Sequence, residues 1–221
     1  MPTFIDLSHT IEDGLITYRG LPAPVICDFW SREFSQAFYE EGTSFQIGKI
    51  EMVANTGTYL DTPFHRYEDG ADLSEISLDQ LALLPAILIH IPHRLTLRID
   101  QTFFQNLDLA GKAVLVHTGW DEYWNTENYY QNHPFLTTDA AKFLVSQGVR
   151  LVGIDAHNID DVSGKSRPVH SILLRNQILI VEHLCNLGRI PATPFSFTAV
   201  PPKIKGMGTF PVRAFAALSE V

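Results

Sequence analysis

The sequence predicts a single mixed α/β domain that spans residues 1–221. Continuous apolar runs bounded by Pro or Gly are typical of buried strands, and residues 85–92 and 112–119 are the clearest examples. These runs alternate with a few helical patterns, without internal repeats or low-complexity tracts. Such alternation favours a mixed β-sheet with flanking helices.

The individual elements follow from apolar patterning and turn residues in chain order. Strands are expected at residues 3–9, 24–30, 45–53, 85–92, 112–119, 149–155, 177–182, 195–200 and 211–218. Residues 73–84 predict one or two short helices with Ser77 as an N-cap, and residues 169–176 predict another. The clearest helix is 137–148, because it starts at capping residues and ends at a Gly. The long aromatic loop 120–134 is a candidate wall for a binding site.

Composition limits the class of protein and its partners. Hydrophobic residues make up 45% of the chain and charged residues 19%, so a sizeable core can form without stabilising crosslinks such as disulfides. A net charge of -9 argues against nucleic acid or an anionic membrane as partner. No apolar run approaches the roughly 20 residues of a membrane helix. Two cysteines outside any CxxC pattern, and a start without a basic and apolar leader, indicate a cytoplasmic protein.

Residues 55–65, Asn-Thr-Gly-Thr-Tyr-Leu-Asp-Thr-Pro-Phe-His, carry the densest set of chemical groups. Gly57 permits a backbone conformation that a Cβ disfavours, and Pro63 fixes its own φ. Together they predict a rigid turn that carries the ionisable side chains of Asp61 and His65. Loops on a stiff scaffold often carry chemistry. A plain polar turn with Asp61 as a cap is the alternative.

Further ionisable side chains gather where the predicted strands end, which is where α/β proteins form active sites. They are His117, Asp155, His157, Asp160, Asp161, His170, Glu182 and His183. A set of His, Asp and Glu without Cys suits Zn²⁺, Mn²⁺ or a related divalent ion. Glu182 is the strongest member, because a carboxylate that ends an apolar strand is costly to bury unless it is paired or metal-bound. His117 is more simply a core residue, and Asp160 a loop acid that bonds nearby backbone amides.

Five residues of the motif His-x-Gly-Thr-His-x-Asp-x-Pro-x-His are present, namely Gly57, Thr58, Asp61, Pro63 and His65. Matching stretches follow at 6–9, 115–120, 149–155, 170–187 and 211–214. Over most of its length the chain therefore resembles the cyclase family of metal-dependent hydrolases, which includes bacterial kynurenine formamidase and isatin hydrolase. The resemblance implies a swivelling α/β fold and a homodimer or homotetramer, with the segment around Trp30 packed across an interface.

The resemblance also implies a metal site, and the chain departs from it at two positions. In the family the two motif imidazoles and the Asp bind one divalent metal, and a downstream His and Glu complete a second position. Asn55 and Tyr59 replace those imidazoles here, and neither an amide oxygen nor a protonated phenol is a good ligand. The resemblance thus implies one Zn²⁺ or Mn²⁺ ion bound by Asp61, His170 and Glu182. A metal-free protein is the alternative.

The activity that the resemblance implies is arylformamidase-like hydrolysis of an N-formyl aryl amine or cyclic amide by a metal-activated water. His65 is implied as the general acid or base and Tyr59 as a second catalytic group. Trp30, Asn55 and Trp120 are expected to contact the small-molecule substrate. Two alternatives stay open: a related enzyme that uses Tyr59 on another substrate, and a metal-free binding protein on the same fold.

Overall fold

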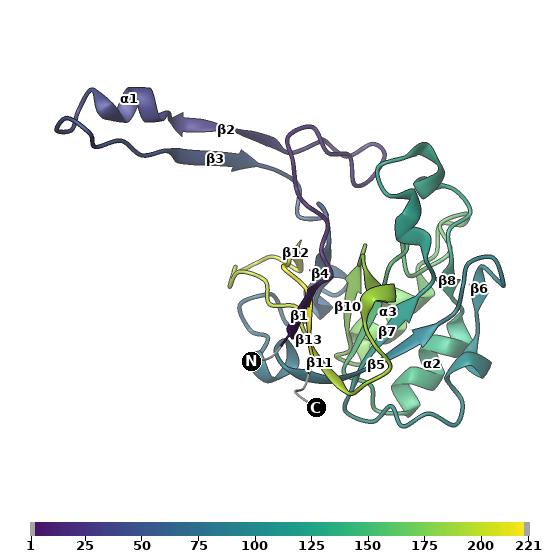
Figure 1. The fold of residues 1–221 in the computed structure, drawn as a ribbon. Coiled ribbons are helices and arrows are strands. Elements are labelled where there is room, and N and C mark those ends of the chain that lie inside the picture. The colour runs from purple at the N-terminus through teal and green to yellow at the C-terminus, as the bar shows by residue number, and fades with distance from the viewer. Residues whose placement is uncertain (1–2, 219–221) are drawn as a thin grey trace.

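A nine-stranded mixed sheet forms the centre of the computed structural model, which describes residues 3–218 (Figure 1). Its strands are β1 (Thr3–Asp6), β4 (Tyr59–Asp61), β5 (Leu84–His90), β7 (Ala113–His117), β9 (Leu151–Ile154), β10 (Leu179–Glu182), β11 (Phe195–Thr198), β12 (Thr209–Pro211) and β13 (Phe215–Leu218). They lie in the order β1-β13-β11-β5-β7-β9-β10-β4-β12. Strands β5, β7, β9 and β10 pair in parallel, and the other pairs are antiparallel. The predicted α/β class and mixed sheet are confirmed.

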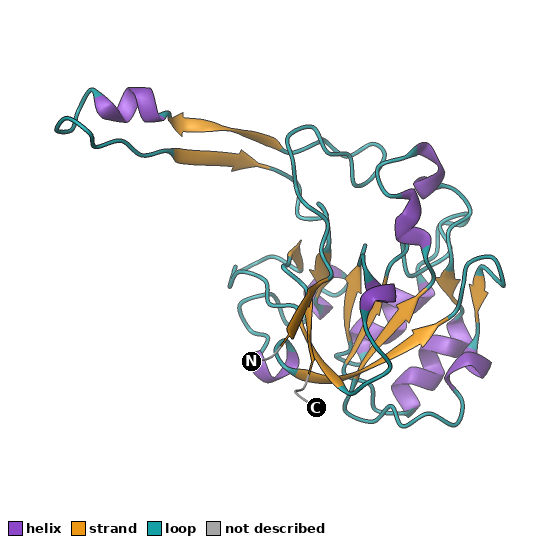
Figure 2. Cartoon of the chain, viewed as in Figure 1, coloured by secondary structure: helices purple, strands orange, loops and turns teal. Residues whose placement is uncertain are grey.

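Helices α2 (Thr138–Ser146) and α3 (Pro168–Arg175) pack together on one face of the sheet (Figure 2). Successive strand side chains point to opposite faces, so Val114 enters the core beneath the helices and Leu115 enters a second core on the other face. The shorter elements are β6 (Arg98–Ile99), β8 (Phe135–Leu136) and 3-10 turns at Pro63–His65, Leu78–Gln80, Gln101–Phe104, Trp120–Tyr123, Glu127–Tyr130 and Leu187–Arg189. Within residues 3–218, no helix has both the length and the apolar character that a membrane span requires.

The helix expected at 137–148 is confirmed as α2. Thr137 caps it, because its hydroxyl accepts a hydrogen bond from the backbone N–H of Ala140 at 3.4 Å. Gly148 follows the last turn with a φ of +68°, the left-handed conformation that glycine adopts without strain. The N-terminal cap and the C-terminal glycine therefore set both ends of this helix.

The helices expected at 73–84 reduce to one 3-10 turn after Ser77. The preceding backbone bonds outward instead, since the N–H of Leu73 donates to the carbonyl of Met207 at 2.9 Å. Further along, the N–H groups of Glu75 and Gln80 bond the carbonyls three residues back, at Asp72 and Ser77, which is the spacing of turns and 3-10 helices. Tertiary contacts override the helical pattern here.

The stretch 55–65 is part strand and part turn, which corrects the expectation of a turn alone. Gly57 has the positive φ that its position suggests, at +66°. Residues Tyr59–Asp61 then form β4, which lies between β10 and β12, and Tyr59 pairs with Glu182. Only Pro63–His65 forms a tight turn. The antiparallel pairing fixes which side chains of the motif face the end of β10.

The strands expected at 24–30 and 45–53 lie outside the main sheet. They form β2 (Val25–Trp30) and β3 (Ile47–Glu51), a two-stranded ribbon that projects from the body and carries α1 (Arg32–Gln36) at its far end (Figure 1). Nearly all of its strand residues are exposed, including Phe29 at 66%. A two-stranded hairpin is marginally stable by itself. The ribbon therefore lacks a packing partner within the described chain.

Gly208 lies where two backbone segments approach closely. A Cβ at this position would lie 2.2 Å from the backbone nitrogen of His65 and 2.5 Å from its Cα. The carbonyl of Gly208 also accepts a hydrogen bond from the N–H of Thr62 at 2.7 Å. The loop before β12 thus holds the turn that carries His65.

We expect Gly208→Ala to lower the free energy of unfolding by about 1–3 kcal/mol, because backbone atoms cannot move aside as a flexible side chain can. Urea denaturation measures the change. Gly48→Ala is the matched control, since nothing lies within 4 Å of a Cβ built there. Equal stability of the two variants would contradict the close approach.

Candidate metal centre

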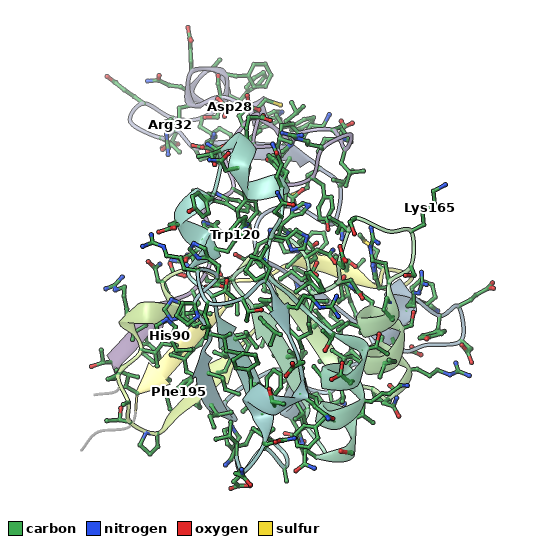
Figure 3. The ribbon with its side chains drawn as sticks, turned by 90° about the vertical axis from the view of Figure 1, so that its right-hand side faces the viewer. Asp28, Arg32, His90, Trp120, Lys165 and Phe195 are labelled. Carbon is green, nitrogen blue, oxygen red and sulfur yellow. The ribbon has the colours of Figure 1, made fainter. Side chains whose placement is uncertain are left out.

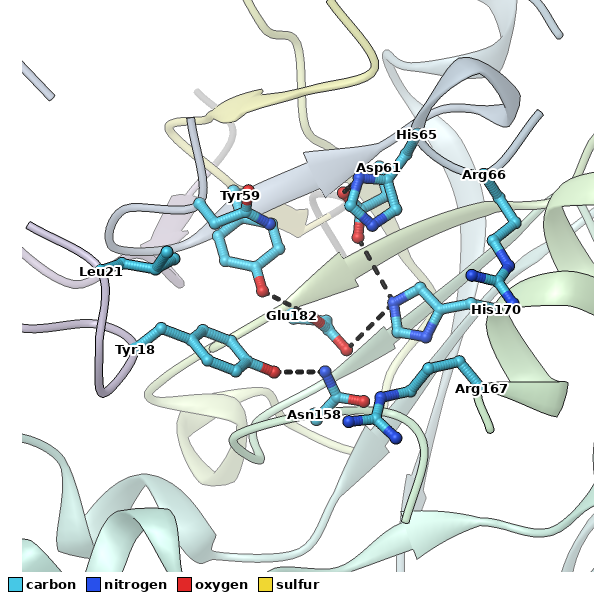
Figure 4. A pocket seen from close by; sticks show the side chains of 11 residues that line it. Tyr18, Leu21, Tyr59, Asp61, His65, Arg66, Asn158, Arg167, His170 and Glu182 are labelled. Atoms are coloured by element: carbon cyan, nitrogen blue, oxygen red, sulfur yellow. Dashed lines mark hydrogen bonds and ion pairs between the residues drawn. The ribbon is translucent and has the colours of Figure 1, made fainter. Parts of the chain in front are cut away.

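Three buried side chains from different elements meet at the end of β10 (Figure 4). Asp61 comes from β4, His170 from α3 and Glu182 from β10. The Nε2 atom of His170 lies 3.6 Å from Asp61 Oδ2 and 3.6 Å from Glu182 Oε1. The structure therefore places Asp61 and Glu182, two of the three predicted metal ligands, beside the Nε2 atom of the third, His170.

Asp160 fixes the orientation of the His170 ring. Its Oδ2 lies 2.7 Å from His170 Nδ1, and its two oxygens accept hydrogen bonds from the backbone N–H groups of Val169 and His170. A carboxylate can only accept, so Nδ1 carries the proton in this contact. Nε2 is then left to face Asp61 and Glu182, which is how metal-binding histidines are oriented. Asp160 does bond backbone amides as expected, but it also has this positioning role.

Glu182 is held on both oxygens. Its Oε2 accepts a hydrogen bond from the hydroxyl of Tyr59 at 2.7 Å, and its Oε1 accepts one from the N–H of Ile159 at 2.6 Å. Burial raises the pKa of Tyr59 well above its ordinary value, and the charge of Glu182 raises it further. Tyr59 is therefore a neutral donor that orients Glu182.

The charges of this cluster determine its protonation. Burial lowers the pKa of His170, but Glu182, Asp160 and Asp61 outweigh burial and raise it to about 10. Burial raises the pKa of Glu182 to about 7 despite the nearby His170. Burial also acts to raise the pKa of Asp61, yet His65 and His170 bring it below its ordinary value. Without another cation, a proton on His170 balances the buried negative charge.

The donor set fits a divalent cation. Asp61 Oδ2 is buried and has no hydrogen-bond partner within residues 3–218, an arrangement that is costly unless something else satisfies the oxygen. Ligand bonds of about 2.0–2.2 Å place neighbouring ligand atoms of a tetrahedral site roughly 3.3–3.5 Å apart. The two 3.6 Å separations are close to that spacing. One imidazole and two carboxylates suit Zn²⁺ or Mn²⁺.

His65 lies beside this centre. Ligand atoms of Asp61, His65 and His170 fall within 4.8 Å of one another. The Nδ1 of His65 lies 2.8 Å from Thr209 Oγ1 and 3.6 Å from Asp61 Oδ1, and a third of the side chain is exposed. This exposure distinguishes His65 from the three buried groups.

A pocket of about 280 Å³ opens over the centre. Its lining includes the candidate ligands Asp61, His170 and Glu182, together with His65 and Tyr59. The other lining residues are Tyr18, Leu21, Asn55, Arg66, Asn158 and Arg167. Asn55 thus lies where a substrate contact was expected. The sequence interpretation did not select the other five. They come from separate segments, and no local pattern marks them as neighbours of the motif.

The two tryptophans expected to contact substrate do not line this pocket. Trp120 is buried in the core beneath the helices, and its indole N–H donates to the carbonyl of Tyr129 at 3.0 Å. Trp30 ends β2 on the projecting ribbon and does not line the pocket, and Figure 3 shows the ribbon residues Asp28 and Arg32 above Trp120 of the body. Within one chain, packing directs both rings away from this pocket, and their contact with a substrate stays a prediction.

A second group of possible ligands, His117, Asp121 and Asp155, lies on the other face of the sheet. The oxygens of Asp155 already accept hydrogen bonds from the backbone N–H groups of Thr118 and Gly119 and from the Thr118 hydroxyl, at 2.5–3.0 Å. Asp155 therefore closes a turn, and its oxygens are not free for a metal.

The chain is similar in sequence and in structure to several known proteins. The model of the family described as "Putative cyclase" matches residues 5–161. Kynurenine formamidase of Geobacillus thermodenitrificans is 28% identical over 97% of both chains, and that of Bacillus cereus is 27% identical over 96% of this chain and 95% of the relative. A solved "potential metal-dependent hydrolase with cyclase activity" is 26% identical over the full length of both chains, with a TM-score of 0.81. Isatin hydrolase A from Labrenzia aggregata shares the fold, with a TM-score of 0.83 and 21% identity over 99% of this chain and 94% of that chain.

Binding of Zn²⁺ or Mn²⁺ should release a proton, because the cation replaces the proton that His170 holds with a pKa of about 10. Between the pKa of about 7 of Glu182 and the pKa of about 10 of His170, only His170 loses a proton, so we expect affinity to rise about tenfold per pH unit between pH 8 and 9. Calorimetric titration of chelator-treated protein in buffers of different ionisation enthalpy measures both effects.

The same titration compares two variants. Asp61→Asn should lose more than about tenfold in affinity, since it removes a ligand charge. Asp69→Asn is its control, because Asp69 is exposed and pairs with Arg175 outside the pocket. Affinity that does not change with pH, or equal affinity of the two variants, would refute this metal site.

Proposed function

Because the chain belongs to the cyclase family, we propose that it is a metal-dependent amide hydrolase of the arylformamidase type. The observation that carries the proposal is the unpartnered, buried Asp61 Oδ2, which faces His170 in a pocket that also holds the partly exposed imidazole of His65. Relatives called kynurenine formamidase match along nearly the whole chain. The proposed substrate is an N-formyl aryl amine or a related cyclic amide.

Asp61, His170 and Glu182 would hold one Zn²⁺ or Mn²⁺ ion. Such an ion polarises a carbonyl oxygen and lowers the pKa of water. Two features of the chain prepare the three ligands for it. Asp160 turns His170 Nε2 toward the other two ligands, and Tyr59 holds Glu182 from the opposite side. Both contacts fix the ligands before an ion binds, which favours its binding.

His65 is proposed as the general base and then the general acid. The single hydroxyl proton of Thr209 is donated to Asp61 Oδ1, which can only accept. The contact between Thr209 Oγ1 and His65 Nδ1 must then be donated by Nδ1–H. This assigns the free lone pair of neutral His65 to Nε2. That atom can take a proton from water and return it to the leaving amine.

We expect chelator-treated protein to regain hydrolysis of N-formylkynurenine or isatin when Zn²⁺ or Mn²⁺ is added. His65→Gln should lower kcat about 10²- to 10⁴-fold without loss of bound metal, because it removes proton transfer and leaves the three ligands in place. His90→Gln is the control, since His90 is exposed at the end of β5 and does not line the pocket.

The outcomes separate the alternatives. If the protein binds metal but hydrolyses neither compound, the result would favour the alternative of a related enzyme that acts on another substrate. Failure to bind metal after reconstitution would favour a non-catalytic binding protein on this fold. Either outcome rejects the arylformamidase assignment.

We further propose that a second copy of the chain covers the ribbon formed by β2 and β3. The ribbon exposes apolar side chains at its base, along its strands and at its end, including Ile26 at 41%, Ile50 at 50% and Phe38 at 64%. Exposed apolar area of this extent is typical of an interaction surface. Two copies could each cover the other's ribbon, since a twofold interface repeats the same contacts. Such an assembly would be a homodimer or a homotetramer.

Analytical ultracentrifugation of the full chain should show a dimer or larger species. The double variant Phe29→Glu/Phe38→Glu should shift it toward monomer, because a buried unpaired charge opposes association. Leu95→Glu places the same charge at a side chain that is 69% exposed on the body, so it should leave the assembly intact. A monomeric wild-type chain would overturn the proposal.

A further inference from the structure

His183 directly follows the candidate ligand Glu182 and has an unusual backbone conformation. Strand β10 ends at Glu182, and the φ of His183 is +57°, in the left-handed region that few residues other than glycine adopt. Successive side chains of an extended strand point to opposite faces, so a His183 that continued β10 would point away from Glu182. The left-handed turn instead brings both side chains to one group, the hydroxyl of Tyr59.

Neighbouring segments hold the backbone of His183 in this conformation. Its carbonyl accepts a hydrogen bond from the hydroxyl of Thr58 at 2.6 Å, and the N–H of Leu184 donates to the carbonyl of Ile154 at 3.0 Å. A side chain in this backbone region costs free energy, and residues of this kind gather at functional sites. Glycine would remove the cost. The conformation thus points to a use for the imidazole ring itself.

The ring belongs to a buried row of hydrogen bonds that leads to Glu182. Its Nδ1 lies 2.8 Å from the hydroxyl of Tyr129, and its Nε2 lies 3.3 Å from the hydroxyl of Tyr59. The Tyr59 hydroxyl lies in turn 2.7 Å from Glu182 Oε2 (Figure 4). Each of the four side chains belongs to a residue that is at most 1% exposed, so bulk water does not compete for these bonds.

The chemistry of the four groups gives this row one direction. The ionised carboxylate of Glu182 can only accept, so the single hydroxyl proton of Tyr59 is donated to it. The contact between Tyr59 and His183 must then be donated by Nε2–H. Within residues 3–218 the His183 ring pairs with no carboxylate, so burial favours its neutral form, which carries one proton. Nδ1 therefore accepts its bond from the hydroxyl of Tyr129.

Tyr129 favours the same tautomer from the far end of the row. With the ring proton on Nδ1, the Tyr129 hydroxyl would have no acceptor within the described residues, and an unsatisfied buried donor is unfavourable. Nε2 would then be a second acceptor beside Glu182 and would compete for the proton of Tyr59. The Nε2–H tautomer removes that competition.

We propose that His183 is a positioning residue, which keeps the Tyr59 hydroxyl donating to Glu182 and so holds this carboxylate in place for the metal ion. His183 does not line the pocket and acts only through Tyr59. The inference rests on the proposed function in one respect, that Glu182 is a metal ligand. The direction of the hydrogen bonds rests on the contacts alone.

The tautomer is measured in the full-length protein with and without Zn²⁺. Proton–nitrogen NMR correlation of protein with isotope-labelled histidine separates the Nε2–H and Nδ1–H forms, and the signals that His183→Gln lacks belong to His183. We expect the Nε2–H form in the wild type and a mixture in Tyr129→Phe, because the hydroxyl that bonds Nδ1 is gone. Tyr130→Phe is the matched control, since the Tyr130 hydroxyl bonds the carbonyl of Ile16. An Nδ1–H ring in the wild type would overturn the inference.

Two substitutions at His183 separate positioning from plain structural support. His183→Gln keeps an N–H donor at the place of Nε2, whereas the shorter side chain of His183→Asn does not reach Tyr59. Both residue types adopt a positive φ in this chain, at Gln177 and Asn186. We expect Zn²⁺ affinity, measured by calorimetric titration, to fall about tenfold in His183→Asn and less than about threefold in His183→Gln.

Urea denaturation of the same two variants supplies the contrast. Asparagine suits the left-handed conformation better than glutamine, so His183→Asn should be at least as stable as His183→Gln. The order of metal affinity and the order of stability are therefore expected to be opposite. Affinities that follow the stabilities would assign His183 a structural role and overturn the inference.

The double variant with Tyr59→Phe tests the route of the effect. Tyr59→Phe removes the hydroxyl through which His183 acts, so it should itself weaken Zn²⁺ binding about tenfold or more. In that background His183→Asn should cause no further loss, because residues that act through one contact are not additive. Additive losses would overturn the inference.

The outcomes keep this inference apart from the proposed function. A chain that binds Zn²⁺ equally in the wild type and in His183→Asn overturns the positioning role and leaves the metal centre standing. A wild-type chain that binds no metal overturns the proposed function, and the Nε2–H tautomer would then still support the direction of the hydrogen bonds.

Discussion

One buried imidazole among three buried carboxylates is the interaction on which the site depends. His170 contacts Asp160 through Nδ1 and lies between Asp61 and Glu182 through Nε2. Burying this much negative charge is unfavourable unless a cation accompanies it, either a proton or a metal ion. The fold brings the groups together from three directions, because α3 supplies the ring, β10 the glutamate and β4 the aspartate. The antiparallel register of β4 against β10 sets their spacing.

Tyr59 shows how this chain adapts the site. Its phenol is fully buried, donates to Glu182 and also lies 3.3 Å from Nε2 of His183. The ring therefore fills the position beside Glu182 with a neutral hydrogen-bond donor. The candidate ligand atoms of Asp61 and Glu182 lie on the other side of Glu182, next to Nε2 of His170. Thr209 has a corresponding role on the other side, because it links Asp61 to the ring of His65.

The pocket and the ribbon lie in parts of the chain that are packed differently. The pocket is bounded by the ends of β4 and β10 and by the start of α3, all within the packed body. Arg66 and Arg167 come from the segments next to these elements. The guanidinium group of Arg66 donates to the hydroxyl of Ser171, and that of Arg167 donates to the carbonyls of Gly164 and Ser166. The strand residues of the ribbon, by contrast, are nearly all exposed. The proposed contact with a second copy would tie the stability of the ribbon to assembly.

The sequence by itself determined the α/β class, the buried apolar strands and helix α2, because these depend on periodicity and caps that are local. The motif at 55–65 and the family resemblance also selected Asp61, His65, His170 and Glu182, and the structure brings these four into one pocket. Only the tertiary structure decided that Asp160 orients His170, that Trp120 lies in the core and that two arginines share the pocket. Strand register and side-chain direction bring together residues that are distant in the chain, and local propensity does not encode those contacts.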